Sequence, residues 1–324
     1  MHTSRSNKKK IVITMGDPSG VGPEVTLKAL ASPKIKGLAD FLLIGDRAAL
    51  DRTAGDMALK FKCELLDLAN VPAASFKYGV QSPVFGKAAI GYLDAAIRLL
   101  RKGEADALVT APVNKMSIRM AGIKKFEGHT EYLAEKTGSK NFAMMFVGGR
   151  LKITLVTRHI ALRRVPGSLA VEPICRTICI THKYLREYFN IKDPRIGVSG
   201  LNPHAGENGA FGDEEDKAII PAIEKATAKV GRISGPIPAD VIFADLMNGK
   251  YDAVVAMYHD QGLIPFKLLY FKDGVNLTIG LPFVRTSPDH GTAFDIAGKG
   301  TADPSSMIEA ILLAYRLCTH NTFV

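Results

Sequence analysis

Long apolar segments are missing from this 324-residue chain. No apolar run approaches the roughly 20 residues that a helix needs to cross a bilayer. The opening residues, MHTSRSNKKK, are charged, and no apolar signal segment follows them before the first expected strand. We therefore expect a cytoplasmic protein with no membrane partner.

Cysteine is scarce, with four residues in the chain. Cys175 and Cys179 are one helical turn apart in a segment with helical patterning. No second pair and no CxxC motif accompanies them, so a cysteine-based zinc site is disfavoured. Buried free thiols are the favoured interpretation.

Concentrated charge of one sign is also absent, although the formal net charge is +10. The tight cationic run is Lys8–Lys10, which we interpret as a solvated tail. Nucleic-acid-binding proteins gather cations on one face, whereas here they are spread through the chain without interleaved aromatics. We expect no nucleic-acid partner, and a basic site for a phosphorylated small molecule explains the charge at least as well.

The remaining composition is that of an ordinary globular enzyme. Hydrophobic residues make up 47% and charged residues 23% of the chain. A chain of this length can bury a large core, and two domains are favoured over one.

The most informative stretch begins at Ala253–Ala256, four apolar residues that predict a buried strand. A polar turn, Tyr258–Gly262, follows and contains His259. In an open α/β sheet the carboxyl ends of strands face the crevice in which ligands bind. His259 is therefore better placed for chemistry than for packing, and Lys267 would supply a nearby cation.

The order of strand and then histidine occurs twice more. Leu151–Thr157 alternates like a strand and is followed by His159. Arg195–Ser199 starts another strand, and the long loop Gly200–Asp213 after it contains His204. Loops of this length in compact domains are usually functional or disordered.

Two interpretations of these histidines stay open. Their spacing of roughly fifty residues matches no local metal signature such as HExxH, so they could be unrelated turn residues. Alternatively, three imidazoles would suit a borderline divalent ion, with Asp240 or substrate oxygens completing its coordination.

A glycine-rich turn, Gly16–Glu24 (GDPSGVGPE), joins the strand Lys10–Met15 to a helix. Such a turn can present backbone N–H groups to an anion. Its glycines match neither GxGxxG nor GxxxxGK[ST]. It therefore lies near a ligand, or it simply lets the helix pack on the sheet.

Other polar residues follow expected strands or precede expected helices. Lys115 is either catalytic or a surface lysine at a helix start. His129 is a possible ligand residue, and Thr130 could be the N-cap of the helix Glu131–Thr137. Two cations and an amide could hold a phosphate or a carboxylate, or could be surface residues: Lys267, Asn276 and, in the loop Gly280–Thr286, Arg285.

With these residues assembled, the chain resembles the 4-hydroxythreonine-4-phosphate dehydrogenase family, NAD-dependent enzymes of pyridoxal phosphate (vitamin B6) biosynthesis. The resemblance covers nearly the whole chain from about Lys10, and the motifs that carry it occur in the family's order: MGDPSGVGPE, GHTEYLA, LNPHAGE, MYHDQG, GLPFVRTS and DHGTAFDIAGKG.

The resemblance implies an α/β fold of two α/β/α domains with a central cleft, similar to isocitrate and isopropylmalate dehydrogenases. We place one domain at residues 1–125 with 278–324 and the other at 126–277, both approximately. The resemblance also implies a homodimer in which both subunits contribute residues to each active site.

The resemblance further implies roles for individual residues. The family's metal positions, for an ion such as zinc, magnesium or cobalt, fall on His159, His204 and His259. Its substrate positions fall on His129, Thr130, Lys267, Asn276 and Arg285. Asp240 lies close to the same site, and Lys115, Asp240 and metal-bound water are the candidates for the general base.

The segment from His290 resembles the adenosine-binding loop of isopropylmalate and isocitrate dehydrogenases. The cofactor residues expected there are His290, Gly291, Thr292, Ala293, Asp295 and Ile296. An acidic residue in this loop can accept hydrogen bonds from ribose hydroxyls and repels a 2′-phosphate, so Asp295 favours NAD over NADP.

The implied reaction is the NAD- and divalent-metal-dependent oxidation of 4-phosphooxy-L-threonine at its C3 hydroxyl. Decarboxylation to 3-amino-2-oxopropyl phosphate follows. The alternatives are a related dehydrogenase of 4-phosphothreonate or 4-phosphoerythronate, a diol dehydrogenase acting on an aromatic carboxylate, and a nucleotide- or phosphate-binding regulatory protein without catalysis.

Overall fold

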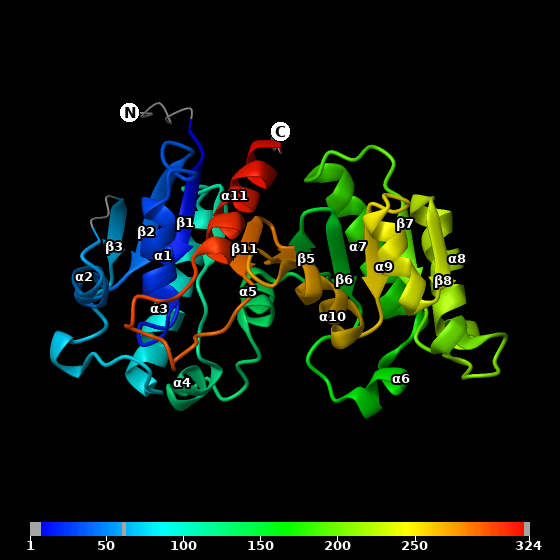
Figure 1. Cartoon of the computed structure of the whole chain (residues 1–324), viewed down its shortest axis with the longest axis horizontal. Helices are drawn as coiled ribbons and strands as arrows, with labels where there is room; N and C mark the ends of the chain where they lie inside the picture. The colour runs from blue at the N-terminus through cyan, green and yellow to red at the C-terminus, as the bar shows by residue number, and fades with distance from the viewer. Residues whose placement is uncertain (1–7, 60–62, 321–324) are drawn as a thin grey trace. The chain divides into compact units, whose positions relative to one another are not determined.

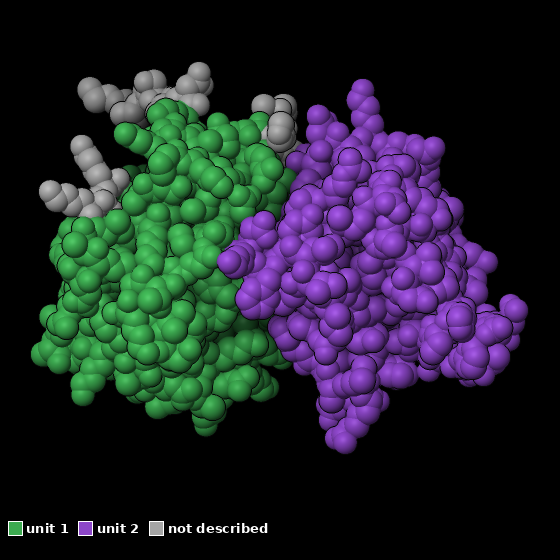
Figure 2. Space-filling view, viewed as in Figure 1, with its two compact units in different colours: residues 1–138, 281–324 green, residues 139–280 purple. Residues whose placement is uncertain are grey.

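The structure, a computed structural model, describes residues 8–59 and 63–320. It is a mixed α/β protein, which confirms the predicted fold class. The chain divides into two compact units, residues 1–138 with 281–324 (unit 1) and residues 139–280 (unit 2), coloured separately in Figure 2. No helix of the described residues is long and apolar enough to cross a membrane.

The boundaries of the units differ from the sequence-based boundaries at 125/126 and 277/278. The difference arises because helix α5 (His129–Thr137) contacts helix α3 (Pro83–Arg101) and so remains with unit 1. His129 and Thr130 are therefore residues of unit 1, whereas the sequence-based boundary placed them in the second domain.

Unit 1 contains a parallel sheet whose described strands lie in the order β3 (Glu64–Asp67), β2 (Asp40–Gly45), β1 (Lys10–Thr14), β4 (Ala107–Thr110) and β11 (Val284–Pro288). Apolar residues on both faces of β1 are fully buried, as is usual where helices cover both sides of a parallel sheet. Its other elements are α1 (Gly22–Ala31), α2 (Arg47–Asp56), η1 (Ala73–Ser75), α4 (Lys115–Met120) and α11 (Ser305–His320).

Unit 2 contains strands in the order β10 (Val275–Ile279), β5 (Ala143–Gly148), β6 (Leu151–Leu155), β9 (Ala253–Ala256), β7 (Ile196–Ser199) and β8 (Ile233–Ile237). Figure 1 labels β5, β6, β7 and β8 of this series. β5 is antiparallel to both β10 and β6, and the remaining pairs are parallel. Two apolar clusters cover the sheet, one with α7 (Val171–Glu187) and α8 (Ile220–Val230), the other with α9 (Ala239–Met247) and α10 (His259–Tyr270). The short helices are η2 (Leu162–Arg164), α6 (Val165–Ser168), η3 (Pro203–Gly206) and η4 (Glu215–Ile219).

Two segments near the predicted site differ from the sequence-based expectation. The polar run after β9 is not a turn, because α10 begins directly at His259. Polar residues suit the first helical turn, where backbone N–H groups have no intrahelical partner. Arg285 lies in strand β11 rather than in a loop, since its backbone pairs in register with Leu108 of β4.

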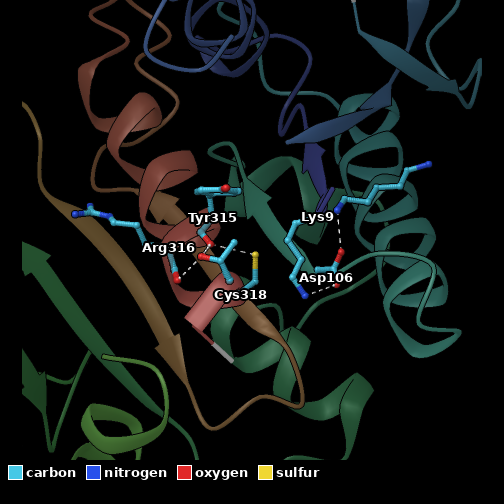
Figure 3. A network of polar contacts seen from close by, with 7 residues as sticks. Lys9, Asp106, Tyr315, Arg316 and Cys318 are labelled. Carbon is cyan, nitrogen blue, oxygen red and sulfur yellow. Dashed lines mark hydrogen bonds and ion pairs between the residues drawn. The ribbon is translucent and has the colours of Figure 1, made fainter. Parts of the chain in front are cut away.

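Lys8 is exposed, but Lys9 and Lys10 are partly buried and do not belong to a solvated tail. Lys9 Nζ lies 3.3 Å from Asp106 Oδ1 (Figure 3), and Lys10, the first residue of β1, pairs with Glu64 at 2.9 Å. Figure 3 also shows Cys318, whose Sγ donates to the Tyr315 carbonyl at 3.3 Å. Burial, with a smaller effect of the Asp106 charge, raises the pKa of this thiol to about 12, so it is an inert core residue.

Candidate active site

The three predicted metal-binding histidines follow three adjacent strands of unit 2. His159 follows β6, His259 follows β9, and His204 follows β7. Strand β9 lies between the other two and is parallel to both. The three carboxyl ends therefore meet at one edge of the sheet, as expected for a ligand site in an α/β protein.

Two of these histidines lie close together in the structure. The ring centroids of His159 and His259 are 5.7 Å apart. The ring of His204 is 6.0 Å from that of Phe211, measured between centroids. Within residues 8–59 and 63–320, no group of three or more His, Cys, Asp or Glu side chains is arranged to hold a metal ion. The third imidazole of the predicted set is thus not assembled with the other two.

The chemistry of this pair fits a divalent ion. Ring nitrogens at about 2.1 Å from a shared ion place two imidazole centroids up to roughly 6 Å apart. His259 Nδ1 lies 2.6 Å from Asp260 Oδ1. A carboxylate on one ring nitrogen orients the imidazole and leaves the other nitrogen for an ion. His204 is exposed, so its ring is accessible to a ligand.

Three other predicted residues belong to unit 2. Asp240 is exposed in the first turn of α9, and α9 contacts the η3 turn that carries His204. Asn276 lies on β10, and its Oδ1 is buried with no hydrogen-bond partner. Lys267 is half-buried on α10, with its Nζ 5.7 Å from the Phe271 ring centroid. The unsatisfied amide oxygen of Asn276 is a feature expected of a ligand site.

Arg285 is the largest fully buried side chain in the described chain, with 2% of its surface exposed. Its Nε and Nη2 donate to Thr110 Oγ1 at 3.2 and 2.6 Å. Burial lowers the pKa of the guanidinium to about 9, and the nearby Glu131 carboxylate partly opposes this shift. Arg285 therefore stays positively charged at neutral pH, and a buried cation favours an anionic ligand.

His129 is the first residue of α5, and its Nε2 is buried without a hydrogen-bond partner. Burial, followed by the charges of Arg285 and Lys115, holds the pKa of this imidazole well below its usual range. His129 is therefore neutral at pH 7. Thr130 is buried inside α5 and is not the N-cap, since Gly128 occupies that position.

Lys115 is exposed as the first residue of α4. The side chain of Asn114 caps this helix by accepting from Ser117 N at 2.9 Å. The cap fixes the turn from which Lys115 projects. Lys115 and Arg285 are thus two cations of unit 1 whose charges act on the neutral His129.

The glycine-rich turn of unit 1 packs against the loop predicted to bind adenosine. Val21 N donates to Thr292 O at 2.9 Å, and a Cβ on Gly20 would lie 2.8 Å from the same oxygen. Gly16 has φ +75°, and a Cβ there would approach Pro112 O to 2.2 Å. Both positions require glycine, because a Cβ would collide with a neighbouring backbone oxygen. The contact at Gly20 also places the turn next to the predicted cofactor loop.

The predicted cofactor loop has two features that suit a nucleotide. His290 Nε2 is buried without a hydrogen-bond partner, although its Nδ1 lies 3.0 Å from Gly291 O. Asp295 is exposed, so its carboxylate is accessible to a ligand. Ala293 adopts a left-handed φ of 40°, and Ile296 N closes the turn onto its carbonyl at 3.1 Å. The loop therefore offers one unsatisfied nitrogen and one accessible carboxylate.

Three residues with unusual environments were not assigned roles from sequence: Asp17, Glu215 and Gln261. Asp17 is buried, and desolvation raises its pKa to about 6. Gln261 and Glu215 bond to the turns that carry the histidines. The sequence offered two signals for such residues. Glu214 and Glu215 directly follow the long loop, and Gln261 lies two residues after His259.

Comparison with known proteins identifies the family. The model of the family described as pyridoxal phosphate biosynthetic protein PdxA matches residues 34–314. A 4-hydroxythreonine-4-phosphate dehydrogenase of Geobacter metallireducens is 46% identical, with 95% of each chain covered. A D-threonate 4-phosphate dehydrogenase of Salmonella typhimurium is 43% identical, over 95% of this chain and 99% of that protein.

Solved structures agree with this assignment. The crystal structure of 4-hydroxythreonine-4-phosphate dehydrogenase from Klebsiella pneumoniae superposes with a TM-score of 0.89 at 39% identity, covering 97% of this chain and 99% of that one. A terephthalate 1,2-cis-dihydrodiol dehydrogenase from Burkholderia xenovorans gives a TM-score of 0.67 at 30% identity, covering 95% and 98%. The chain belongs to the PdxA family of pyridoxal phosphate biosynthetic proteins.

Proposed function

We propose that this protein is an NAD- and divalent-metal-dependent dehydrogenase that oxidises 4-phosphooxy-L-threonine at its C3 hydroxyl and releases carbon dioxide. The observation that supports this most strongly is the delivery of His159, His204 and His259 to one sheet edge by adjacent parallel strands. Loss of the substrate carboxylate gives 3-amino-2-oxopropyl phosphate, a precursor in pyridoxal phosphate biosynthesis.

The phosphate end of the substrate needs cations and hydrogen-bond donors. Arg285 keeps its charge while buried, and Lys267 adds a second cation to the proposed clamp. The amide of Asn276 has a buried oxygen without a partner, which a donor on the substrate would satisfy. Neutral His129 and buried Thr130 supply further hydrogen bonds without adding charge.

The oxidation step moves a hydride and a proton from the substrate. A divalent ion held by the three histidines would stabilise negative charge on the reacting oxygen. NAD, when bound, would accept the C3 hydride, and the hydroxyl proton would pass to a base, for which Lys115 and Asp240 are the candidates. The resulting β-keto acid loses its carboxylate as carbon dioxide. The electron pair of the broken bond is then quenched by a proton.

A second substrate is supported by relatives of equal similarity. The D-threonate 4-phosphate dehydrogenases are 43–44% identical to this chain, as similar as a 4-hydroxythreonine-4-phosphate dehydrogenase at 44%. The two substrates share a phosphate and a C3 hydroxyl and differ at C2, which carries an amine in one and a hydroxyl in the other. Activity with 4-phosphothreonate is therefore the leading alternative.

A substrate panel separates these proposals. Purified protein is assayed with each phosphorylated acid, with NAD or NADP, before and after treatment with a chelator. We expect NAD reduction with 4-phosphooxy-L-threonine that is lost on chelation and restored by added metal. Reduction with 4-phosphothreonate alone would replace the preferred substrate. No turnover with any acid would favour a binding protein without catalysis.

We also propose that the protein works as a homodimer through α10. Four large apolar side chains of this helix or its end are exposed: Ile264 at 69%, Leu268 at 83%, Leu269 at 52% and Phe271 at 74%. Residues three and four positions apart lie on the same side of a helix, so Ile264, Leu268 and Phe271 share a face. An apolar face of this kind is typical of a protein interface. Lys267 lies on the same helix, consistent with a site completed by both subunits.

A further inference from the structure

The cofactor segment, residues 289–304 between β11 and α11 of unit 1, includes the predicted cofactor residues His290–Ile296. All of its residues are described, and none lies in a helix or a strand. Segments of this length without regular structure are usually functional or disordered. Contacts with the rest of unit 1 must therefore hold the segment in its shape.

The first half of the segment is held by the glycine-rich turn, Gly16–Glu24. Val21 N donates to Thr292 O at 2.9 Å. Two hydrogen-bonded turns then connect the first half to the second. Ile296 N donates to Ala293 O, and Lys299 N donates to Ile296 O, each at 3.1 Å. A displacement of the residues after Lys299 would therefore move the turn that carries Asp295.

Lys28 of α1 holds the second half of the segment. Its Nζ donates to Gly300 O and to Ala302 O, each at 2.8 Å. The same nitrogen donates to Glu24 Oε1 at 2.8 Å. An ammonium group has three N–H donors, so all of them are used in this arrangement.

Glu24 completes the attachment at Ala302. Its Oε1 accepts from Ala302 N at 2.8 Å, in addition to the bond from Lys28. Glu24 is 1% exposed, so these bonds are shielded from water. Both backbone polar groups of Ala302 are thus bonded to side chains of α1.

The two attachments belong to one continuous stretch of chain. Glu24 and Lys28 are four positions apart in α1 and therefore lie on the same side of the helix. α1 begins at Gly22, directly after Val21, which bonds the first half of the segment. The glycine-rich turn and α1 together fasten both halves of the cofactor segment.

We propose that Lys28 and Glu24 are positioning residues for the adenosine end of NAD, which hold the cofactor segment in the shape that meets the nucleotide. The inference rests on the proposed function, because it takes NAD to bind at this segment. Neither residue needs to contact NAD. A segment that is fixed before binding loses less conformational entropy when the nucleotide binds, which increases affinity.

The test measures binding of NADH and of ADP-ribose, which lacks the nicotinamide, to the full-length protein by calorimetry. Lys28→Met removes both bonds from the ammonium to the segment at similar side-chain length. The double variant Glu24→Gln with Lys28→Met also avoids an unpaired buried carboxylate and keeps an oxygen for Ala302 N. Lys9→Met is the matched control, since the same substitution there removes the ion pair with Asp106 in unit 1.

We expect both Lys28 variants to raise the Kd values of NADH and ADP-ribose by the same factor, about tenfold, because the lost support acts on the adenosine end. Lys9→Met should bind both like the wild type. In turnover, KM for NAD should rise while kcat and KM for the phosphorylated acid stay unchanged. A general loosening of unit 1 would raise both KM values, since Arg285 of the proposed phosphate clamp belongs to the same unit.

The outcomes separate this inference from the proposed function. If the wild type binds neither NADH nor ADP-ribose, the proposed cofactor is wrong and the inference falls with it. If the wild type binds both and the folded double variant binds them equally well, the cofactor stands and the positioning role is overturned. An equal rise of both KM values, or an equal loss of binding by Lys9→Met, would also overturn it. Melting temperatures show which variants are folded, and the double variant decides if Lys28→Met alone unfolds.

Discussion

At the scale of single residues, burial sets the properties of the titratable groups near the candidate site. Arg285 is charged although buried, His129 is neutral, and Asp17 has a pKa raised to about 6. All three groups are buried, and desolvation makes each charge state sensitive to a ligand or to pH. Asp17→Asn tests the charge state of Asp17, and Arg285→Lys tests the planar guanidinium of Arg285.

Asp17→Asn should change how stability depends on pH. The folded-state pKa of Asp17, about 6, lies above its usual value of 3.8 because burial disfavours the charged carboxylate. Its contribution to stability is therefore lost as pH rises from about 4 through 6, by roughly 3 kcal/mol in total. Asparagine does not titrate and can still accept from Ser19 N, a bond of 2.9 Å in the wild type.

The measurement is the melting temperature of both proteins between pH 4.5 and 7.5. The variant should gain stability relative to the wild type as pH rises, because other groups titrate equally in both. A difference in melting temperature that stays constant over this range would show that Asp17 does not titrate there.

Arg285→Lys should weaken substrate binding although it keeps the charge. Lysine cannot reproduce the planar guanidinium that bonds Thr110 and, in our proposal, the phosphate. Losing a charge-assisted hydrogen bond costs about 1.5–3 kcal/mol, so we expect KM for the phosphorylated substrate to rise about 10- to 100-fold. Steady-state kinetics check this against Arg195→Lys, which alters a guanidinium paired with Asp252 in unit 2. Equal KM values in both variants would contradict a phosphate role for Arg285.

At the scale of elements, one glycine sets the distance between two helices of unit 1. Gly86 of α3 lies so close to α4 that an added Cβ would be 2.0 Å from Ser117 O. Gly55 of α2 has no atom within 4 Å of the same position. The first glycine is required by packing, whereas the second only weakens its helix.

The two glycine-to-alanine substitutions should therefore have opposite effects. Gly86→Ala must push α4 away from α3 and should destabilise the protein by about 1–3 kcal/mol. Gly55→Ala adds helix propensity and should stabilise it by up to about 1 kcal/mol. Differential scanning calorimetry gives both shifts. Equal melting temperatures for the two variants would contradict the close approach of the helices.

At the scale of the whole molecule, activity should depend on association through α10. Leu268→Glu places a charge in the middle of the exposed apolar face and should convert the proposed dimer to a monomer with little activity. Val84→Glu is the control, because Val84 is also exposed, at 39%, but lies on α3. Sedimentation velocity and NAD reduction measure the two effects. A monomeric wild type, or a fully active monomeric variant, would contradict the proposed shared site.

The sequence alone was sufficient for elements with strong local patterns. The choice of the three histidines as metal ligands stays a prediction. Four consecutive apolar residues predicted β9, and the alternating run from Leu151 predicted β6. Strand β11 was missed because Arg285 interrupts its apolar pattern, and this arginine is buried by contacts with a strand far away in the sequence. Family motifs then selected the candidate site residues.

Tertiary structure alone decided which of these residues meet. Periodicity depends on neighbours a few positions apart, so it can indicate that a strand ends before His159, His204 or His259. It cannot indicate that β6, β9 and β7 are adjacent, since sheet order depends on how the whole unit packs. The bond from Gln261 to Gly200 spans 61 residues, and no local pattern encodes such a partner. The sequence thus determined the chemical groups, and packing determined their arrangement.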